Sequence, residues 1–207
     1  MLIYIIIGFT VLFSYKGFQD RNFFYKYDFD PYQIKNQNQY YRFVSHAFLH
    51  ADWTHLFFNM FVLWMFGKSA LRNFEYFSGD IGVFYYILLY FCGILFATLT
   101  TFKKYQDTPN YHSIGASGAV SAVLFSYIVF QPMQELRLLI FPFFGLPSVV
   151  WGVAYLVYSH YQSQKNSDHI NHDAHLWGAV FGIAFTLIFV PESFGNFIAQ
   201  VGNAINF

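Results

Sequence analysis

Long apolar blocks separated by short polar stretches make up most of this 207-residue chain. Leu, Ile, Phe and Tyr fill these blocks around the whole circumference of a helix rather than along one face. All-round hydrophobicity of this kind is typical of helices that lie in a lipid bilayer. The pattern therefore predicts an all-α fold, a polytopic membrane protein built as a bundle of six transmembrane helices.

The six predicted spans cover residues 2–15, 53–71, 81–102, 114–130, 147–160 and 173–190. Prolines set several of their limits: Pro132 follows the fourth, Pro147 begins the fifth at a favourable first position, and Pro191 closes the sixth. Thr54 is the expected N-cap of the second span. The first segment has neither a basic n-region nor an A-x-A cleavage site, so we interpret it as a retained helix rather than a signal peptide.

Two connections have an unusual composition. Residues 16–45 mix acidic and basic residues with many aromatic ones, which favours the headgroup level of a membrane. Residues 137–147 are apolar but contain two prolines and Gly145, so a surface-hugging connection is expected there instead of a helix. The length suits one domain over residues 1–207, with a membrane-associated first loop at about 16–45.

Composition supports the membrane interpretation. Only 11% of the residues are charged and 56% are hydrophobic, whereas a soluble protein has about 25% charged residues. The formal net charge is zero, which gives no reason to expect a nucleic-acid partner.

Three groups of polar or small residues at the ends of predicted spans can carry chemistry. His55 and Asn59 are four residues apart and share one helix face, where both can donate hydrogen bonds to a negatively charged oxygen. The alternative is a structural link between helices, worth about 0.6 kcal/mol per bond.

Ser117 lies between small residues in Gly115-Ala116-Ser117-Gly118, where amides at a helix start remain unpaired. Small residues in membrane helices also serve packing, which is the alternative here. His175 shares a face with Gly178 and Gly182, and this face allows a neighbouring helix to come close. If that neighbour carries Ser117, the imidazole is brought toward the hydroxyl as a base; a helix-capping histidine is the alternative.

Taken together, these motifs resemble the signature of rhomboid intramembrane serine proteases. The matching segments are His46-x3-His50-x4-His55-x3-Asn59, Gly115-x-Ser117-Gly118 and Ala174-His175-x2-Gly178-x3-Gly182. Upstream, Tyr41-Arg42 is similar to the family's Trp-Arg pair in the first loop. The resemblance implies a six-helix bundle of rhomboid type.

The resemblance also implies a serine endopeptidase that cleaves transmembrane helices of membrane proteins in the bilayer through an acyl-enzyme. Ser117 would be the nucleophile and His175 the general base and later acid. His55, Asn59 and the Ser117 amide would form the oxyanion hole. Structural or cavity-lining roles would fall to the remaining motif residues: Arg42, His46, His50, Gly115, Gly118, Gly178 and Gly182. No metal or other cofactor is expected, the protein is multi-pass and integral to a membrane (the cell membrane in a bacterium), and nothing indicates its oligomeric state.

The chain departs from the family pattern at several positions. Tyr41 replaces the usual Trp. Ser121 stands where many relatives carry a Tyr that packs on the catalytic histidine, so the sequence does not say what orients His175. The connection at residues 67–79 is longer than the common G-x-x-x-E pattern, with Glu75 a loose match.

Membrane orientation receives two opposing indications. If the N-terminus lies inside, the inner loops hold only Lys68, Arg72 and Arg137, so the positive-inside rule favours the reverse orientation. The family resemblance instead places the active site toward the outside. We follow the resemblance, because a first loop embedded in the membrane does not behave as a short free loop.

Two other functions compete with proteolysis. Histidines at 46, 50 and 55, and at 169, 172 and 175, are spaced as in membrane metalloenzymes, and imidazole suits iron and zinc. However, the chain has no HExxH motif. A catalytically silent rhomboid-like protein that binds transmembrane helices is the second alternative, although this chain retains both Ser117 and His175.

Overall fold

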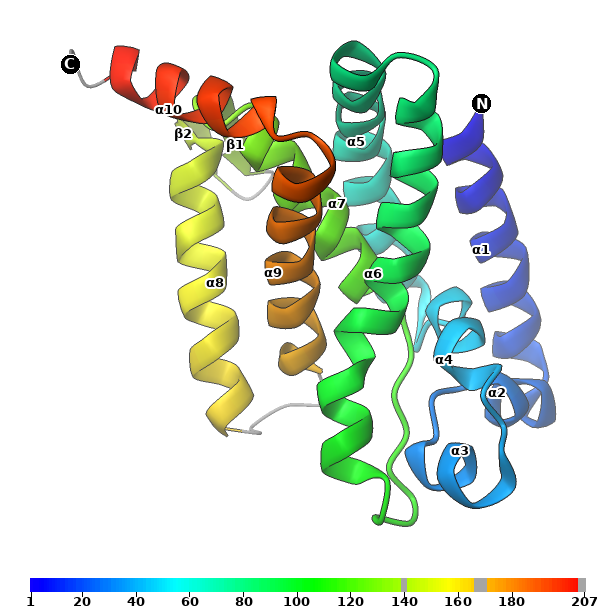
Figure 1. The fold of residues 1–207 in the computed structure, drawn as a ribbon. Helices are drawn as coiled ribbons and strands as arrows, with labels where there is room; N and C mark the ends of the chain where they lie inside the picture. The colour runs from blue at the N-terminus through cyan, green and yellow to red at the C-terminus, as the bar shows by residue number, and fades with distance from the viewer. Residues whose placement is uncertain (139–140, 166–170, 205–207) are drawn as a thin grey trace.

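The computed structural model describes residues 1–138, 141–165 and 171–204. Long helices stand side by side, short helices gather at one end, and α10 lies across the other end (Figure 1). The long helices are α1 (Leu2–Gln19), α5 (Trp53–Ser78), α6 (Ile81–Tyr105), α7 (Ser117–Phe130), α8 (Ser148–Lys165) and α9 (His172–Phe189). The others are α2 (Arg21–Tyr27), α3 (Pro31–Gln37), α4 (Arg42–Ser45), the 3-10 turn η1 (His46–Phe48) and α10 (Glu192–Ala204).

Helix α7 forms the centre of the bundle. All of its residues except Ser117 and Leu124 are buried, and α5, α6 and α9 pack around it. The outer helices show the reverse pattern, with large apolar side chains such as Leu12, Phe57 and Ile188 exposed. Exposed apolar side chains of this kind face lipid in a membrane protein.

The six predicted spans correspond to the six long helices, with shifted ends. Helix α5 continues past the predicted end at residue 71 to Ser78, where Gly79 stops it with φ 61° and ψ −141°, a conformation open mainly to glycine. Within the described residues, three helices are long and apolar enough to cross a bilayer: Leu2–Gln19, Ile81–Tyr105 and His172–Phe189. The chain is therefore a helical membrane protein, and the count of six spans stays a prediction.

The prediction of Thr54 as the N-cap of the second span is wrong. Asp52 caps α5 instead, and its carboxylate accepts a hydrogen bond from the His55 amide at 2.8 Å. An anionic cap is favoured at this position because the helix dipole places partial positive charge there.

The all-α class needs one correction. Strand β1 (Glu135–Leu138) pairs antiparallel with β2 (Phe141–Pro147), with Glu135 opposite Pro147 and Arg137 opposite Gly145. Prolines are tolerated here because both strands of a two-stranded ribbon are edge strands. Pro147 ends β2, so it does not begin the next helix as predicted; α8 starts at Ser148.

Helix α10 was not predicted, because the pattern ended at Pro191. It holds the C-terminal end of α7, whose last carbonyl groups accept no hydrogen bond from within that helix. The side-chain amides of Asn196 and Gln200 both donate to the Phe130 carbonyl oxygen at 2.9 Å.

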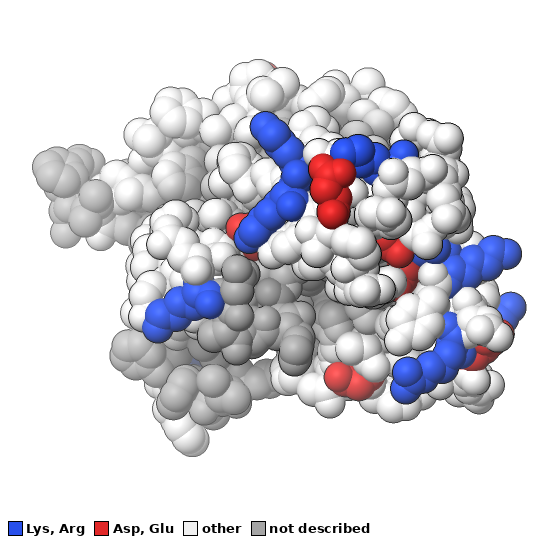
Figure 2. Space-filling model, turned by 90° about the horizontal axis from the view of Figure 1, so that it is seen from below, with Lys and Arg blue, Asp and Glu red and all other residues white. Residues whose placement is uncertain are grey.

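The first loop folds into α2, α3 and α4 and lies against the end of the bundle where α7 begins (Figure 1). Viewed from below, this end carries basic and acidic side chains close together (Figure 2). Two ion pairs there join distant segments: Lys35 with Asp107 at 2.6 Å and Lys104 with Asp173 at 3.5 Å. This end is therefore the polar face nearest the predicted site.

Candidate functional site

A cavity of about 510 Å³ lies among the N-terminal ends of α5, α7 and α9. Most of the predicted site residues line it together: His46, His55, Asn59, Gly115, Ser117, Gly118 and His175. Among the other predicted residues, His50 packs edge-on against His55, Gly178 and Gly182 lie at the contact of α9 with α7, and Arg42 lies in the first loop. The fold thus gathers residues from three separate motifs around one space.

Gly115 shapes the turn before Ser117. Its φ is +117°, and a Cβ atom there would lie 2.9 Å from His55 Cε1 and 3.0 Å from His55 Nε2. Both the backbone conformation and the contact require glycine. The same Cβ position is 3.9 Å from Ser117 Oγ, so the His55 ring and the serine hydroxyl both lie close to Gly115.

His46 and His50 hold the backbone of this turn. The Gly115 amide donates to the His46 carbonyl oxygen at 3.0 Å, and the Ala116 amide donates to His50 Nε2 at 3.5 Å. Because Nε2 of His50 accepts, its Nδ1 carries the proton and donates to Ser14 Oγ at 3.0 Å. The neighbouring helix α1 therefore supports the turn through His50.

Both of these histidines are neutral. Burial lowers the pKa of His46 to about 4, although its bond to the Arg42 carbonyl acts in the opposite direction. Burial also lowers the pKa of His50 to about 3, and the nearby His55 adds to the effect. Neutral rings fit the hydrogen bonds just described, in which each ring has one donor nitrogen.

His55 and Asn59 present donors toward the cavity from one face of α5. The Ala51 amide donates to His55 Nδ1 at 3.4 Å, so the proton of the neutral ring is on Nε2, the atom beside Gly115. Asn59 donates one amide hydrogen to the His55 carbonyl oxygen at 3.0 Å, and a side-chain amide has a second hydrogen to donate.

Helices α7 and α9 meet through their glycines. A Cβ atom at Gly178 would lie 2.9 Å from the Gly118 carbonyl carbon, and one at Gly182 would lie 2.8 Å from the Ala122 carbonyl carbon. Only a hydrogen atom fits at these positions, so the two backbones are in contact. The neighbour of the His175 face is thus the helix that carries Ser117.

The His175 ring packs against Tyr155 of α8. Their ring centroids are 6.3 Å apart with an angle of 21° between the planes, and the Tyr155 hydroxyl lies 2.7 Å from Ser121 Oγ. Ser121 stands where a tyrosine that packs on the histidine was expected, so the sequence did not say which ring would contact His175. In the structure that ring is Tyr155 of α8, and Ser121 forms a hydrogen bond with its hydroxyl.

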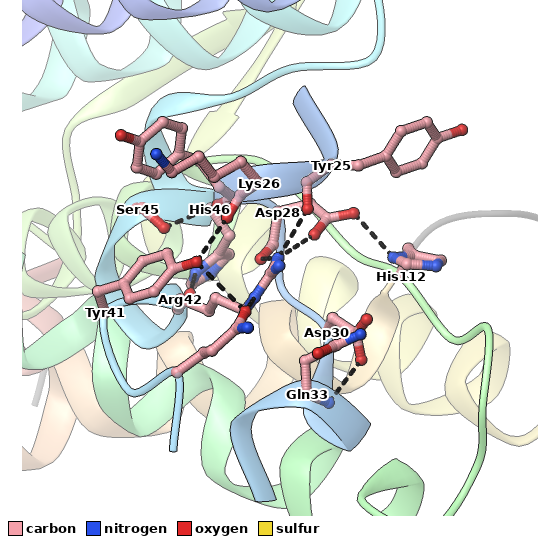
Figure 3. A network of polar contacts seen from close by, with 12 residues as sticks. Tyr25, Lys26, Asp28, Asp30, Gln33, Tyr41, Arg42, Ser45, His46 and His112 are labelled. Carbon is pink, nitrogen blue, oxygen red and sulfur yellow. Dashed lines mark hydrogen bonds and ion pairs between the residues drawn. The ribbon is translucent and has the colours of Figure 1, made fainter. Parts of the chain in front are cut away.

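Arg42 organises the first loop through a network of polar contacts (Figure 3). Its guanidinium is buried and pairs with the fully buried Asp28 carboxylate, while Nε donates to Gln39 Oε1 at 2.7 Å. The other carboxylate oxygen of Asp28 lies 2.8 Å from Nδ1 of His112. This ion-pair network links the first loop to the segment that enters α7.

Sequence reasoning missed two residues that also line the cavity. His112 looked isolated, because its partner Asp28 is 84 positions away. Asn171 caps α9 through the Ala174 amide at 3.0 Å and donates to Thr101 Oγ1 at 3.1 Å, which fixes the start of the His175 helix. An Asn directly before a helical segment is the only sequence signal for that role.

Apolar helices around a cavity that several polar side chains line define the class: an integral, multi-pass membrane protein with a candidate site inside its bundle. Residues 37–192 match the Rhomboid domain family, and the chain belongs to that family.

The chain is similar to two proteins of Arabidopsis thaliana. It is 31% identical over 163 residues to Rhomboid-like protein 11, chloroplastic, which covers 73% of this chain and 53% of the relative. It is 29% identical over 157 residues to RHOMBOID-like protein 12, mitochondrial, covering 70% of this chain and 45% of the relative. The chain spans about half the length of these curated relatives.

Proposed function

We propose that this protein is an intramembrane serine endopeptidase that cleaves transmembrane segments of other membrane proteins. One observation carries the proposal: Ser117, His175, His55 and Asn59 all line one cavity at the ends of three helices. A nucleophile, a base and hydrogen-bond donors within one space are the parts that acyl transfer needs.

In this mechanism His175 takes the proton of the Ser117 hydroxyl as its oxygen attacks the scissile carbonyl carbon. The resulting oxyanion accepts hydrogen bonds from His55 Nε2, the second Asn59 amide hydrogen and the Ser117 backbone amide. This amide can donate to the oxyanion because first-turn amides have no acceptor within their own helix. His175 then protonates the leaving amine, and a water molecule hydrolyses the acyl-enzyme through the same groups.

The depth of the serine supports cleavage within the membrane. Helix α7 has 14 residues, which at a rise of about 1.5 Å per residue is shorter than the roughly 30 Å hydrocarbon core. In a bundle with six spans, Ser117 would then lie below the membrane surface. Non-helical backbone at such depth is tolerated where it lines a water-filled cavity, and residues 112–116 line this one.

The hydrogen bonds of His46 and His50 weaken the alternative of a membrane metalloenzyme. The Nδ1 of His46 donates to the Arg42 carbonyl, and His50 uses both ring nitrogens in hydrogen bonds. Over residues 1–138, 141–165 and 171–204, no three His, Cys, Asp or Glu side chains are placed to hold a metal ion. His169, part of the second histidine group, lies outside the described residues.

The test is cleavage of a model transmembrane substrate in liposomes by wild type, Ser117→Ala and His175→Ala. Each substitution is expected to reduce kcat by up to about 10⁶-fold, the loss that removal of the serine or the histidine causes in the triad protease subtilisin. A fluorophosphonate probe should label wild type and leave Ser117→Ala unlabelled. Cleavage retained by either variant would refute the dyad, and a folded wild type that neither cleaves nor reacts would favour a silent, helix-binding relative.

A further inference from the structure

Helix α8 contacts the predicted general base, His175, through the side chain of Tyr155. Tyr155 is partly buried, and its ring lies nearly parallel to that of His175 at 6.3 Å. This separation is within the range of offset aromatic stacking. The stack restricts rotation of the imidazole about its side-chain bonds.

A stacked tyrosine positions a histidine only if the tyrosine is itself fixed. The Tyr155 hydroxyl and Ser121 Oγ are 2.7 Å apart, and Ser121 is 3% exposed, so this hydrogen bond is shielded from competing water. The Tyr155 ring also packs against Phe125 at 5.6 Å. Both partners belong to α7.

Ser121 follows Ser117 by four residues, which is about one helical turn. The helix that carries the nucleophile therefore also fixes the ring that packs on the base. Contact runs from Ser121 on α7 to Tyr155 on α8 and then to His175 on α9, beside the direct glycine contact of α7 with α9.

From this arrangement we propose that Tyr155, held by Ser121, is a positioning residue for His175. The inference rests on the proposed function, because it assigns no chemistry to Tyr155 itself. Its ring keeps the imidazole turned toward the serine, and its hydroxyl keeps the ring in place.

Kinetics of three variants test this. Tyr155→Leu removes the ring and is expected to reduce kcat by tenfold or more, since displacement by about 1 Å can cost about 100-fold. KM should stay within about twofold, because Tyr155 does not line the cavity. Tyr155→Phe keeps the ring and should restore most of the lost kcat. The matched control is Tyr161→Leu, an exposed tyrosine on the same helix, which should leave kcat unchanged.

A double-mutant cycle isolates the hydrogen bond. Tyr155→Phe and Ser121→Ala each remove it, so each should reduce kcat by a few-fold, and the double variant should be no slower than the slower single variant. Additive losses, or no loss in either, would overturn the role of Ser121. The cycle also decides the matter if Tyr155→Leu melts early in detergent.

The labelling rate of Ser117 by a fluorophosphonate separates the two proposals. A wild type that cleaves and labels normally, with Tyr155→Leu retaining full kcat and labelling rate, would refute the positioning role alone. A wild type that neither cleaves nor labels would refute the proposed function, and the role of Tyr155 with it.

Discussion

Gly178→Ala is expected to separate the helices that carry the predicted dyad. The new Cβ atom would lie 2.9 Å from the Gly118 carbonyl carbon and closer still to its oxygen. Carbon atoms in ordinary contact are about 3.5–4.0 Å apart, so α7 and α9 must part by about 1 Å. Overpacking of this kind costs about 1–3 kcal/mol of folding free energy. Because His175 is one turn before Gly178, we also expect kcat to fall by about 100-fold.

Thermal unfolding in detergent and cleavage kinetics in liposomes measure the two effects. Gly8→Ala is the matched control: Gly8 is also helical, a Cβ atom there would have no other atom within 4 Å, and the replacement should stabilise α1 by about 0.5–1 kcal/mol. A Gly178→Ala variant with wild-type stability and kcat would refute the argument that this contact holds the two helices in place.

Two further predictions concern the first loop and the histidines that contact the turn before Ser117. Asp28→Asn leaves the buried Arg42 guanidinium without its carboxylate and should lower the free energy of unfolding by about 3–5 kcal/mol. Asp107→Asn, in an exposed ion pair, should lower it by less than about 1 kcal/mol. Denaturant titration of both variants in detergent measures the two losses, and equal losses would contradict the prediction. The pKa values of His46 and His50 are lower in the folded protein than in the unfolded chain. As pH falls below about 6.5, these two histidines therefore bind protons in the unfolded chain while they stay neutral in the folded protein. Stability should be constant above that pH and fall by about 1.4 kcal/mol per unit and per histidine below it, and unfolding midpoints that stay level between pH 7 and 5 would contradict the assignment.

Much of the helical bundle could be predicted because apolar residues make up most of each long helix. The spacing of His55 and Asn59, and of His175 and Gly178, also places each pair on one face once the segment is a helix. Helix ends were less predictable, since they depend on single residues such as Asp52 and Gly79. The strands β1 and β2 were missed because proline and glycine argue against a helix without specifying what replaces it.

The support of the site could not be predicted, because it depends on contacts between distant segments. Tyr155 belongs to no motif, and only the packing of α8 brings it to His175. His112 and Asp28 are separated along the chain by the whole of α5 and α6. Local pattern carries no information on such pairs, whereas the motif residues were predicted from their spacing together with the resemblance to a known family.

The first loop is a structural part of the candidate site rather than a separate appendage. The residues that directly follow it accept hydrogen bonds from the serine turn, the His46 carbonyl from the Gly115 amide and the His50 ring from the Ala116 amide, and Asp28 of the loop binds His112 just upstream. These contacts hold the backbone on both sides of Gly115, whose positive φ costs conformational entropy to fix. Since the serine follows two residues later, its position depends on the first loop as well as on α7. Weakening the Arg42 network should therefore impair Ser117 before it unfolds the bundle.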